Sequence, residues 1–158
     1  MTTEQKQRNL TRLRHVHHAG CIVCGSRNKQ GLKLSFQTRP DGSIEGKFPC
    51  HRLLQGYDGL VHGGVISAVL DSAMTNCLFA HGIVAVTGEL TVRFLQPVLL
   101  IDVAAIRANI KASIPPLHRM EASMRQNGRI VARATARFME RTMRKEVINP
   151  KVNERSAG

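Results

Sequence analysis

Short stretches of the chain have the residue pattern of β-strands, and one longer stretch is apolar on nearly every side. Alternation of apolar and polar residues with a period of two is typical of a strand with one buried face. Strand-like stretches, several of them clearly alternating, occur over 32–37, 44–48, 84–95, 102–111, 117–126 and 129–140. Residues 62–80 hold a run of small and apolar side chains that ends at His81-Gly82, and this run predicts a long helix buried on most of its faces.

Turn signals separate these elements. Pro40-Asp41-Gly42-Ser43 predicts a turn between the first two strands, and Ile114-Pro115-Pro116 interrupts the chain before the strand at 117–126. Asn127-Gly128 is a strong signal for a two-residue hairpin. The order is therefore two strands, one buried helix and four antiparallel strands. We expect an α+β fold in which a single antiparallel sheet wraps around one long central helix.

The chain has 158 residues, which is enough for one domain with a substantial core. We divide it into a basic N-terminal arm or short helix at 1–20, a folded domain at 21–141 and a basic C-terminal tail at 142–158. The N-terminal residues lack the apolar core of a secretory signal, and the apolar runs are short for a membrane span. We therefore expect a cytoplasmic protein with no membrane partner.

The net charge of +12 favours an anionic partner, such as nucleic acid, a membrane surface, a phosphate-bearing cofactor or an acidic carrier protein. About half of this charge lies on the two ends of the chain. Tyr57 is the only tyrosine and there is no tryptophan, so platforms for stacking bases are hard to build. We therefore expect no nucleic acid among the partners.

The segment Val61–Asp71 carries the most chemical information. It is a loop that enters the predicted helix through Gly63-Gly64, and the start of a helix offers unpaired N–H groups suited to an oxyanion or a thioester carbonyl. Asp71 is either a base or nucleophile on a small, mostly apolar face, or a solvated helix residue. His62 is either a general acid or a residue that orients the loop. The two glycines also permit close packing.

The spacing within this segment has a further consequence. Eight residues of helix separate Gly63 from Asp71 and rise about 12 Å, so the two residues of one chain cannot touch the same reacting carbonyl. If both belong to one site, then two chains must build it.

Two stretches of sequence carry a resemblance to a known family. They are Gln55-Gly56-Tyr57-Asp58-Gly59-Leu60-Val61-His62-Gly63-Gly64 before the helix and Thr87-Gly88-Glu89-Leu90-Thr91-Val92-Arg93-Phe94-Leu95-Gln96-Pro97 after it. With Asp71 between them, this order resembles the hotdog-fold acyl-CoA thioesterases, especially the phenylacetate-pathway and 4-hydroxybenzoyl-CoA thioesterase-like groups. The resemblance covers roughly residues 20–140.

The resemblance implies roles for several residues. Asp71 would be the catalytic carboxylate, and it would attack the thioester carbonyl or activate water. The N–H of Gly63 would hold the oxyanion, and Thr87 would position water. Gln55 would lie near the thioester, although the aligned position is its neighbour Gly56.

The resemblance also implies a substrate and an assembly. An acyl-CoA would be hydrolysed to a free acid and coenzyme A without a metal, in a homodimer or dimer of dimers with shared active sites. Gly64 would contact the substrate, and the phosphates of coenzyme A would meet basic residues, for which the candidates are Arg93, Arg107, Lys111 and Arg125.

Two other functions remain open at this level. The first is a non-catalytic module of the same fold that binds acyl-CoA or an acyl carrier, although residues 1–20 are too few for a DNA-reading helix-turn-helix. The second is a dehydratase or hydratase, which needs a His and a carboxylate in a different loop-helix pattern. Asp71 within the helix favours hydrolysis.

Cys21-Ile22-Val23-Cys24-Gly25 has the cysteine spacing of a zinc knuckle. A tetrahedral site needs two more ligands, and the chain has no second pair of this kind. Related chains often begin with such a segment, so we favour a packed turn over a structural zinc ion here. The residues that would complete a zinc site are His15, His17, His18 and Cys50-His51.

Overall fold

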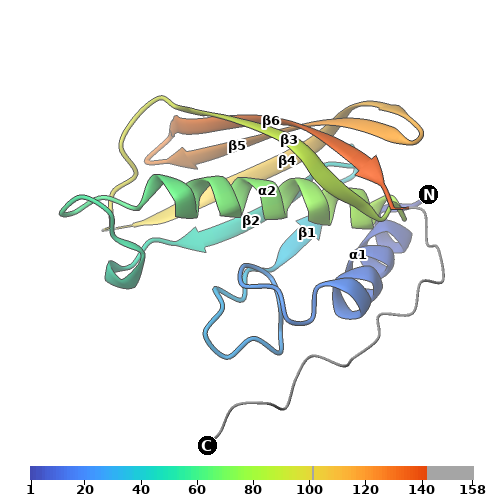
Figure 1. The fold of residues 1–158 in the computed structure, drawn as a ribbon, viewed down its shortest axis with the longest axis horizontal. Coiled ribbons are helices and arrows are strands. Elements are labelled where there is room, and N and C mark those ends of the chain that lie inside the picture. The colour runs from blue at the N-terminus through green and yellow to red at the C-terminus, as the bar shows by residue number, and fades with distance from the viewer. Residues whose placement is uncertain (101, 142–158) are drawn as a thin grey trace, which may run out of the picture.

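The computed structural model describes residues 1–100 and 102–141, and the C-terminal tail expected at 142–158 lies outside the described residues. Within these described residues, two α-helices, one 3-10 turn and six strands follow one another (Figure 1). Their bounds are α1 Thr3–His17, β1 Phe36–Thr38, β2 Ile44–Pro49, the 3-10 turn Arg52–Leu54, α2 Gly63–Ala80, β3 Ala85–Phe94, β4 Val103–Ile114, β5 Leu117–Gln126 and β6 Arg129–Glu140.

The six strands form one antiparallel sheet in the order β1-β2-β4-β5-β6-β3. The sheet curves around α2, which lies along its concave face, as Figure 1 shows. This is the α+β arrangement of a sheet wrapped around one long helix that the sequence predicted, and it is the hotdog fold. Because β3 is the last strand in the order, one of its edges has no neighbour within the described chain.

The core forms where the sheet meets α2. Alternate positions of the long strands are buried and small, such as Ala104 and Ala108 on β4 and Ala132 and Ala134 on β6. These alanines let the helix lie close to the sheet, so that its larger side chains fill the space between the two layers. The largest of these on α2 are Leu70, Met74 and Leu78.

By length and composition alone α2 is long and apolar enough to cross a membrane, although the sequence had suggested that no apolar run is long enough. In the structure 67% of its 18-residue stretch is buried inside the fold. The apolar composition of α2 is therefore explained by its place as the core helix.

Most of residues 1–20 form a helix, α1, that packs on the rest of the domain. Thr2 caps α1 in a capping box with Gln5, and the helix buries Leu10 and Leu13. The Gln7 side chain also bonds to the backbone of Phe36 and Thr38, which ties α1 to β1. The packing of α1 on the domain therefore continues across the domain boundary predicted at residue 20.

The first predicted strand is shorter than its alternation indicated. The sequence predicted residues 32–37, whereas β1 spans only Phe36–Thr38. Leu32 and Leu34 donate their N–H groups to the carbonyls of Ile22 and Val23, and Lys33 between them has a positive φ of 52°. Leu34 is buried and Leu32 partly buried beside the Cys21–Cys24 turn, a pairing that local alternation does not reveal.

Candidate active site

The start of α2 presents a free backbone donor. His62 is the N-cap residue, and its Nδ1 accepts the Gly64 N–H at 2.9 Å. The carbonyl of His62 accepts the N–H groups of Val65 and Ile66. Within residues 1–100 and 102–141, the Gly63 N–H is left without a hydrogen-bond acceptor. This N–H and the positive end of the helix dipole suit a carbonyl oxygen or an oxyanion.

The loop before α2 fixes the position of His62. The N–H of His62 bonds to the carbonyl of Leu54, and the Gln55 Oε1 accepts the Gly59 N–H at 3.1 Å, which closes the loop. A Cβ atom on Gly56 would lie 3.0 Å from the His62 Cα, so a side chain at this position would displace the cap. Gln55 and Gly56 therefore both shape the loop that leads to the Gly63 N–H.

Asp71 forms the second part of the site. Its side chain is partly buried, and its Oδ1 accepts the Thr87 hydroxyl at 2.6 Å. Burial raises the pKa of Asp71 above its ordinary value of 3.8, while the Thr87 hydrogen bond and the charge of His18 act in the opposite direction. A carboxylate with a raised pKa beside a hydroxyl is suited to accept a proton or to attack a carbonyl.

A β-bulge in β3 brings Thr87 to this carboxylate. Thr87 pairs with Phe138 and Glu89 with Arg137, so Gly88 is an extra residue without a partner across the ladder. Alternation would otherwise place Thr87 and Leu90 on opposite faces, because they are three positions apart. The bulge places both on the α2 side of the sheet, where Leu90 packs against the core and Thr87 bonds to Asp71.

Sequence reasoning missed Phe94. A Cβ atom on Gly63 would lie 3.4 Å from the Cζ atom of Phe94, so the ring covers the start of α2. Its side chain is nevertheless 55% exposed. The alternation Leu90, Val92, Phe94 beyond the bulge is the signal that would have placed it on this face.

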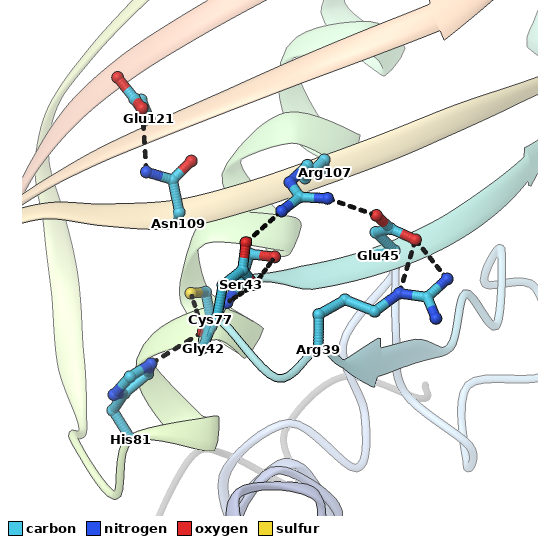
Figure 2. Close-up of polar contacts among 10 residues, drawn as sticks. Arg39, Gly42, Ser43, Glu45, Cys77, His81, Arg107, Asn109 and Glu121 are labelled. Atoms are coloured by element: carbon cyan, nitrogen blue, oxygen red, sulfur yellow. Dashed lines mark hydrogen bonds and ion pairs between the residues drawn. The ribbon is translucent and has the colours of Figure 1, made fainter. Parts of the chain in front are cut away.

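The predicted basic residues do not gather around Asp71. Arg93 is exposed and lies between Val92 and Phe94, so it points to the sheet face away from α2, where it is paired across the ladder with Arg133. Arg107 also lies on the outer face and binds the carboxylates of Asp41 and Glu45, and Figure 2 shows Glu45 shared between Arg107 and Arg39. Two other candidates have partners too: Lys111 pairs with Glu121, and Arg125 donates to the carbonyl of Gly128.

Some of these residues line an open hollow of about 690 Å³ on the outer face of β1, β2, β4 and β5. Its basic walls include Arg39, Lys47, Arg107 and Arg125, with Glu45 among them. The sheet separates this hollow from Asp71, so within one chain it is not part of the site on α2.

The arrangement as a whole defines a class of protein. A carboxylate on the central helix accepts a hydroxyl from β3, and a free N–H lies at the start of that helix, under a sheet of hotdog topology. Comparison with known proteins agrees with this class. The model of the thioesterase superfamily matches residues 58–113, which include the end of the loop before α2, α2 itself, β3 and most of β4.

Among curated proteins, the chain is similar to acyl-coenzyme A thioesterase THEM4 of Rattus norvegicus, with 34% identity over 58 residues, or 37% of this chain. THEM4 of Mus musculus is 33% identical over the same length. The chain spans about a quarter of the length of these relatives, since the match covers 25% of each.

Among solved structures, a phenylacetic acid degradation-related protein from Ralstonia eutropha is 25% identical, with a TM-score of 0.63, over 68% of this chain and 85% of that one. The E. coli PaaI protein, from the phenylacetic acid degradation operon, is 14% identical, with a TM-score of 0.74, over 89% of this chain and 96% of that one. A Streptococcus pneumoniae thioesterase protein solved with coenzyme A is 21% identical, with a TM-score of 0.64, over 68% and 87%.

The chain therefore has the hotdog fold, and its residues 58–113 match the thioesterase superfamily. The family and the fold expected from the resemblance of Gln55–Gly64 and Thr87–Pro97 are both confirmed.

Proposed function

We propose that the protein is an acyl-CoA thioesterase whose active site combines Asp71 and Thr87 of one subunit with the Gly63 N–H of another. The observation that supports this most directly is the partly buried Asp71 carboxylate, with its raised pKa and its 2.6 Å hydrogen bond from Thr87. The reaction is the addition of water across the thioester, which gives a free acid and the thiol of coenzyme A.

Each residue has a distinct part in this reaction. The Gly63 N–H donates to the thioester oxygen, which gains negative charge as the carbonyl is attacked. Asp71 either takes a proton from the attacking water or attacks the carbonyl itself. Thr87 holds the carboxylate in place, and Gly64 remains a candidate for contact with the substrate. His62 acts by capping α2, since its Nδ1 already accepts the Gly64 N–H.

The relatives support both the substrate class and the residue pair. The curated relatives are acyl-coenzyme A thioesterases, and the streptococcal structure contains coenzyme A. Two further structures of the streptococcal protein carry an aspartate or a threonine replaced by alanine, at positions sixteen residues apart. Asp71 and Thr87 have the same separation of 16 residues.

Distance and exposed surface both support a second subunit at each site. Gly63 and Asp71 of one chain lie about 12 Å apart along α2, too far for one carbonyl to touch both. The free edge of β3 and the half-exposed side of α2 offer a surface for another copy, and Val86, Phe94 and Leu95 are large apolar residues exposed there. A two-fold dimer through this surface gives two equivalent sites.

The deciding experiment measures coenzyme A release from short, medium, long and aryl acyl-CoA thioesters, for the wild type and for Asp71→Asn. We expect turnover on at least one class and a loss of roughly 10²–10⁴-fold in kcat for the variant, with the oligomer intact by light scattering. Binding of acyl-CoA without turnover of any thioester by the wild type would instead indicate a non-catalytic acyl-CoA module.

A further inference from the structure

His18, Cys21 and Cys24 form a cluster of metal-ligating side chains next to α1. Their nearest ligand atoms all lie within 4.8 Å of one another. His18 is the C-cap residue of α1, Cys21 is half-buried and Cys24 is 2% exposed. The three residues come from one short stretch of chain, so a single chain forms the cluster without a second subunit.

The distance between two of these atoms matches a tetrahedral zinc site. The Sγ of Cys24 lies 3.6 Å from the Nδ1 of His18. Bonds of about 2.3 Å from zinc to sulfur and about 2.0–2.1 Å to nitrogen, opened at the tetrahedral angle, place the two ligand atoms about 3.5 Å apart. The Sγ of Cys21 lies at most 4.8 Å from each of the other two ligand atoms. Small side-chain rotations would shorten both distances to those of a zinc site.

The turn that carries the cysteines is built to hold both sulfurs. The Val23 N–H donates to the Cys21 Sγ at 3.4 Å, and such a bond compensates the negative charge of a metal-bound thiolate. The Gly25 N–H bonds to the Cys21 carbonyl at 2.9 Å. A Cβ atom on Gly25 would lie 2.4 Å from the backbone nitrogen of Cys21, so only glycine fits this close turn.

The ligands are also fixed from outside the turn. Leu32 and Leu34 bond to the carbonyls of Ile22 and Val23 on one side. On the other side the His18 ring meets Phe79 of α2 edge-on, with ring centroids 5.1 Å apart. The cluster is therefore held between α1, α2 and the segment that leads into β1. Because the ligands are already ordered, binding of a metal ion there would cost little ligand entropy.

We propose that His18, Cys21 and Cys24 bind one zinc ion, with water as the fourth ligand. Two sulfurs and one imidazole nitrogen favour Zn²⁺ over hard cations such as Mg²⁺ or Ca²⁺. Binding displaces the protons of both thiols, so each Zn²⁺ bound releases two protons. The ion joins the end of α1 to the turn that leads into β1, and it secures α1 on the core. The sequence favoured a packed turn, because the two cysteines supply only two of four ligands and the chain has no second pair of this kind.

The experiment uses the full chain, kept reduced, with Co²⁺ as a spectroscopic probe and Zn²⁺ as the competitor. We expect an intense sulfur-to-cobalt absorption in the near ultraviolet, visible bands of tetrahedral cobalt, and displacement by one equivalent of Zn²⁺. Cys21→Ser, Cys24→Ser and His18→Gln should each weaken zinc binding by about 100-fold or more. The matched controls are Cys50→Ser, a buried cysteine elsewhere, and His15→Gln, an exposed histidine of α1, and both should bind zinc like the wild type.

A second measurement does not depend on the folding of any variant. Mass spectrometry after alkylation of the wild type should show Zn²⁺ protecting Cys21 and Cys24 together. Absence of the sulfur-to-cobalt absorption in the reduced wild type would overturn the proposal. Zinc binding that persists in Cys21→Ser and Cys24→Ser, or a Cys21–Cys24 disulfide that forms in place of metal binding, would overturn it as well.

Discussion

Asp71 is subject to opposing influences, and the balance between them sets the pH at which it works. Burial raises the pKa of its carboxyl group, while the hydrogen bond from Thr87 lowers that pKa. The proposed chemistry needs the ionised form, because only a carboxylate accepts a proton or attacks a carbonyl. Thr87 therefore holds the carboxylate in position and also extends its working range toward acid pH.

The pH profile of Thr87→Val tests this balance. Removing the hydroxyl removes an influence that lowers the pKa of Asp71, so that pKa rises further. The acid limb of kcat/KM should then move to higher pH, with a larger loss of activity at acid than at alkaline pH. Thr87→Ser keeps a hydroxyl and should keep the wild-type limb. A uniform loss across all pH values would assign Thr87 a role in packing alone.

Asp71→Asn should stabilise the fold while it abolishes turnover. Since burial raises the pKa of Asp71 above 3.8, the folded state binds the proton more tightly than the unfolded state. The stability that this proton contributes is complete below pH 3.8 and is lost as the pH rises through the raised pKa. The neutral amide avoids this loss and keeps an oxygen for Thr87.

Thermal unfolding across pH measures the effect. The Tm of Asp71→Asn should exceed that of the wild type at neutral pH, and the difference should shrink as the pH falls. Asp58→Asn, which changes an exposed loop carboxylate, should leave the Tm unchanged at every pH. A lower Tm for Asp71→Asn at neutral pH would mean that the charge stabilises the fold.

At the level of elements, the bulge in β3 decides which side chains face α2. Deleting Gly88 restores plain alternation, so Thr87 and the residues after it cannot all keep their faces. The deletion should reduce kcat at least as much as Thr87→Val does. Gly88→Ala keeps the extra residue, and its Cβ meets only the Arg137 carbonyl at an ordinary 3.5 Å, so it should retain activity within a few-fold. Equal activity of the deletion and the wild type would contradict this role of the bulge.

The same bulge explains part of what the sequence could not predict. Alternation placed five of the six strands, and a continuous run of small and apolar residues placed α2, which is buried on most of its faces. It did not place Phe94 over Gly63, because one unpaired residue at Gly88 changes which positions share a face. Alternation also predicted a first strand that is too long. Leu32 and Leu34 alternate like strand residues, but they bond to the turn at Cys21–Cys24 and do not belong to β1.

The site residues divide in a similar way. The role proposed for Asp71 rests on a carboxylate on an apolar helix together with the resemblance, whereas its contact with Thr87 needed the three-dimensional fold. Basic residues were the least predictable, because any exposed arginine matches a phosphate by charge alone. Arg107 instead binds Asp41 and Glu45 on the outer face.

At the scale of the whole molecule, the question is whether two chains share each site. Gly63→Pro removes the proposed oxyanion donor with little harm to α2. Gly63 is the first helical residue, where proline is tolerated, and His62 before it has the extended conformation that proline requires, with φ −62° and ψ 133°. Gly63→Ala keeps the N–H and serves as the control. Loss of one oxyanion donor should lower kcat by about 10²–10³-fold in the proline variant.

Mixing the two inactive variants then reveals the origin of each site. Asp71→Asn and Gly63→Pro subunits, unfolded together and refolded at equal amounts, give mixed dimers for half of the population. If each site takes Asp71 from one chain and Gly63 from the other, a mixed dimer holds one site with both changes and one intact site. About a quarter of wild-type activity should therefore return, as two-fold symmetry requires. Sites formed within single chains would give no recovery, because every site would then carry one of the two changes.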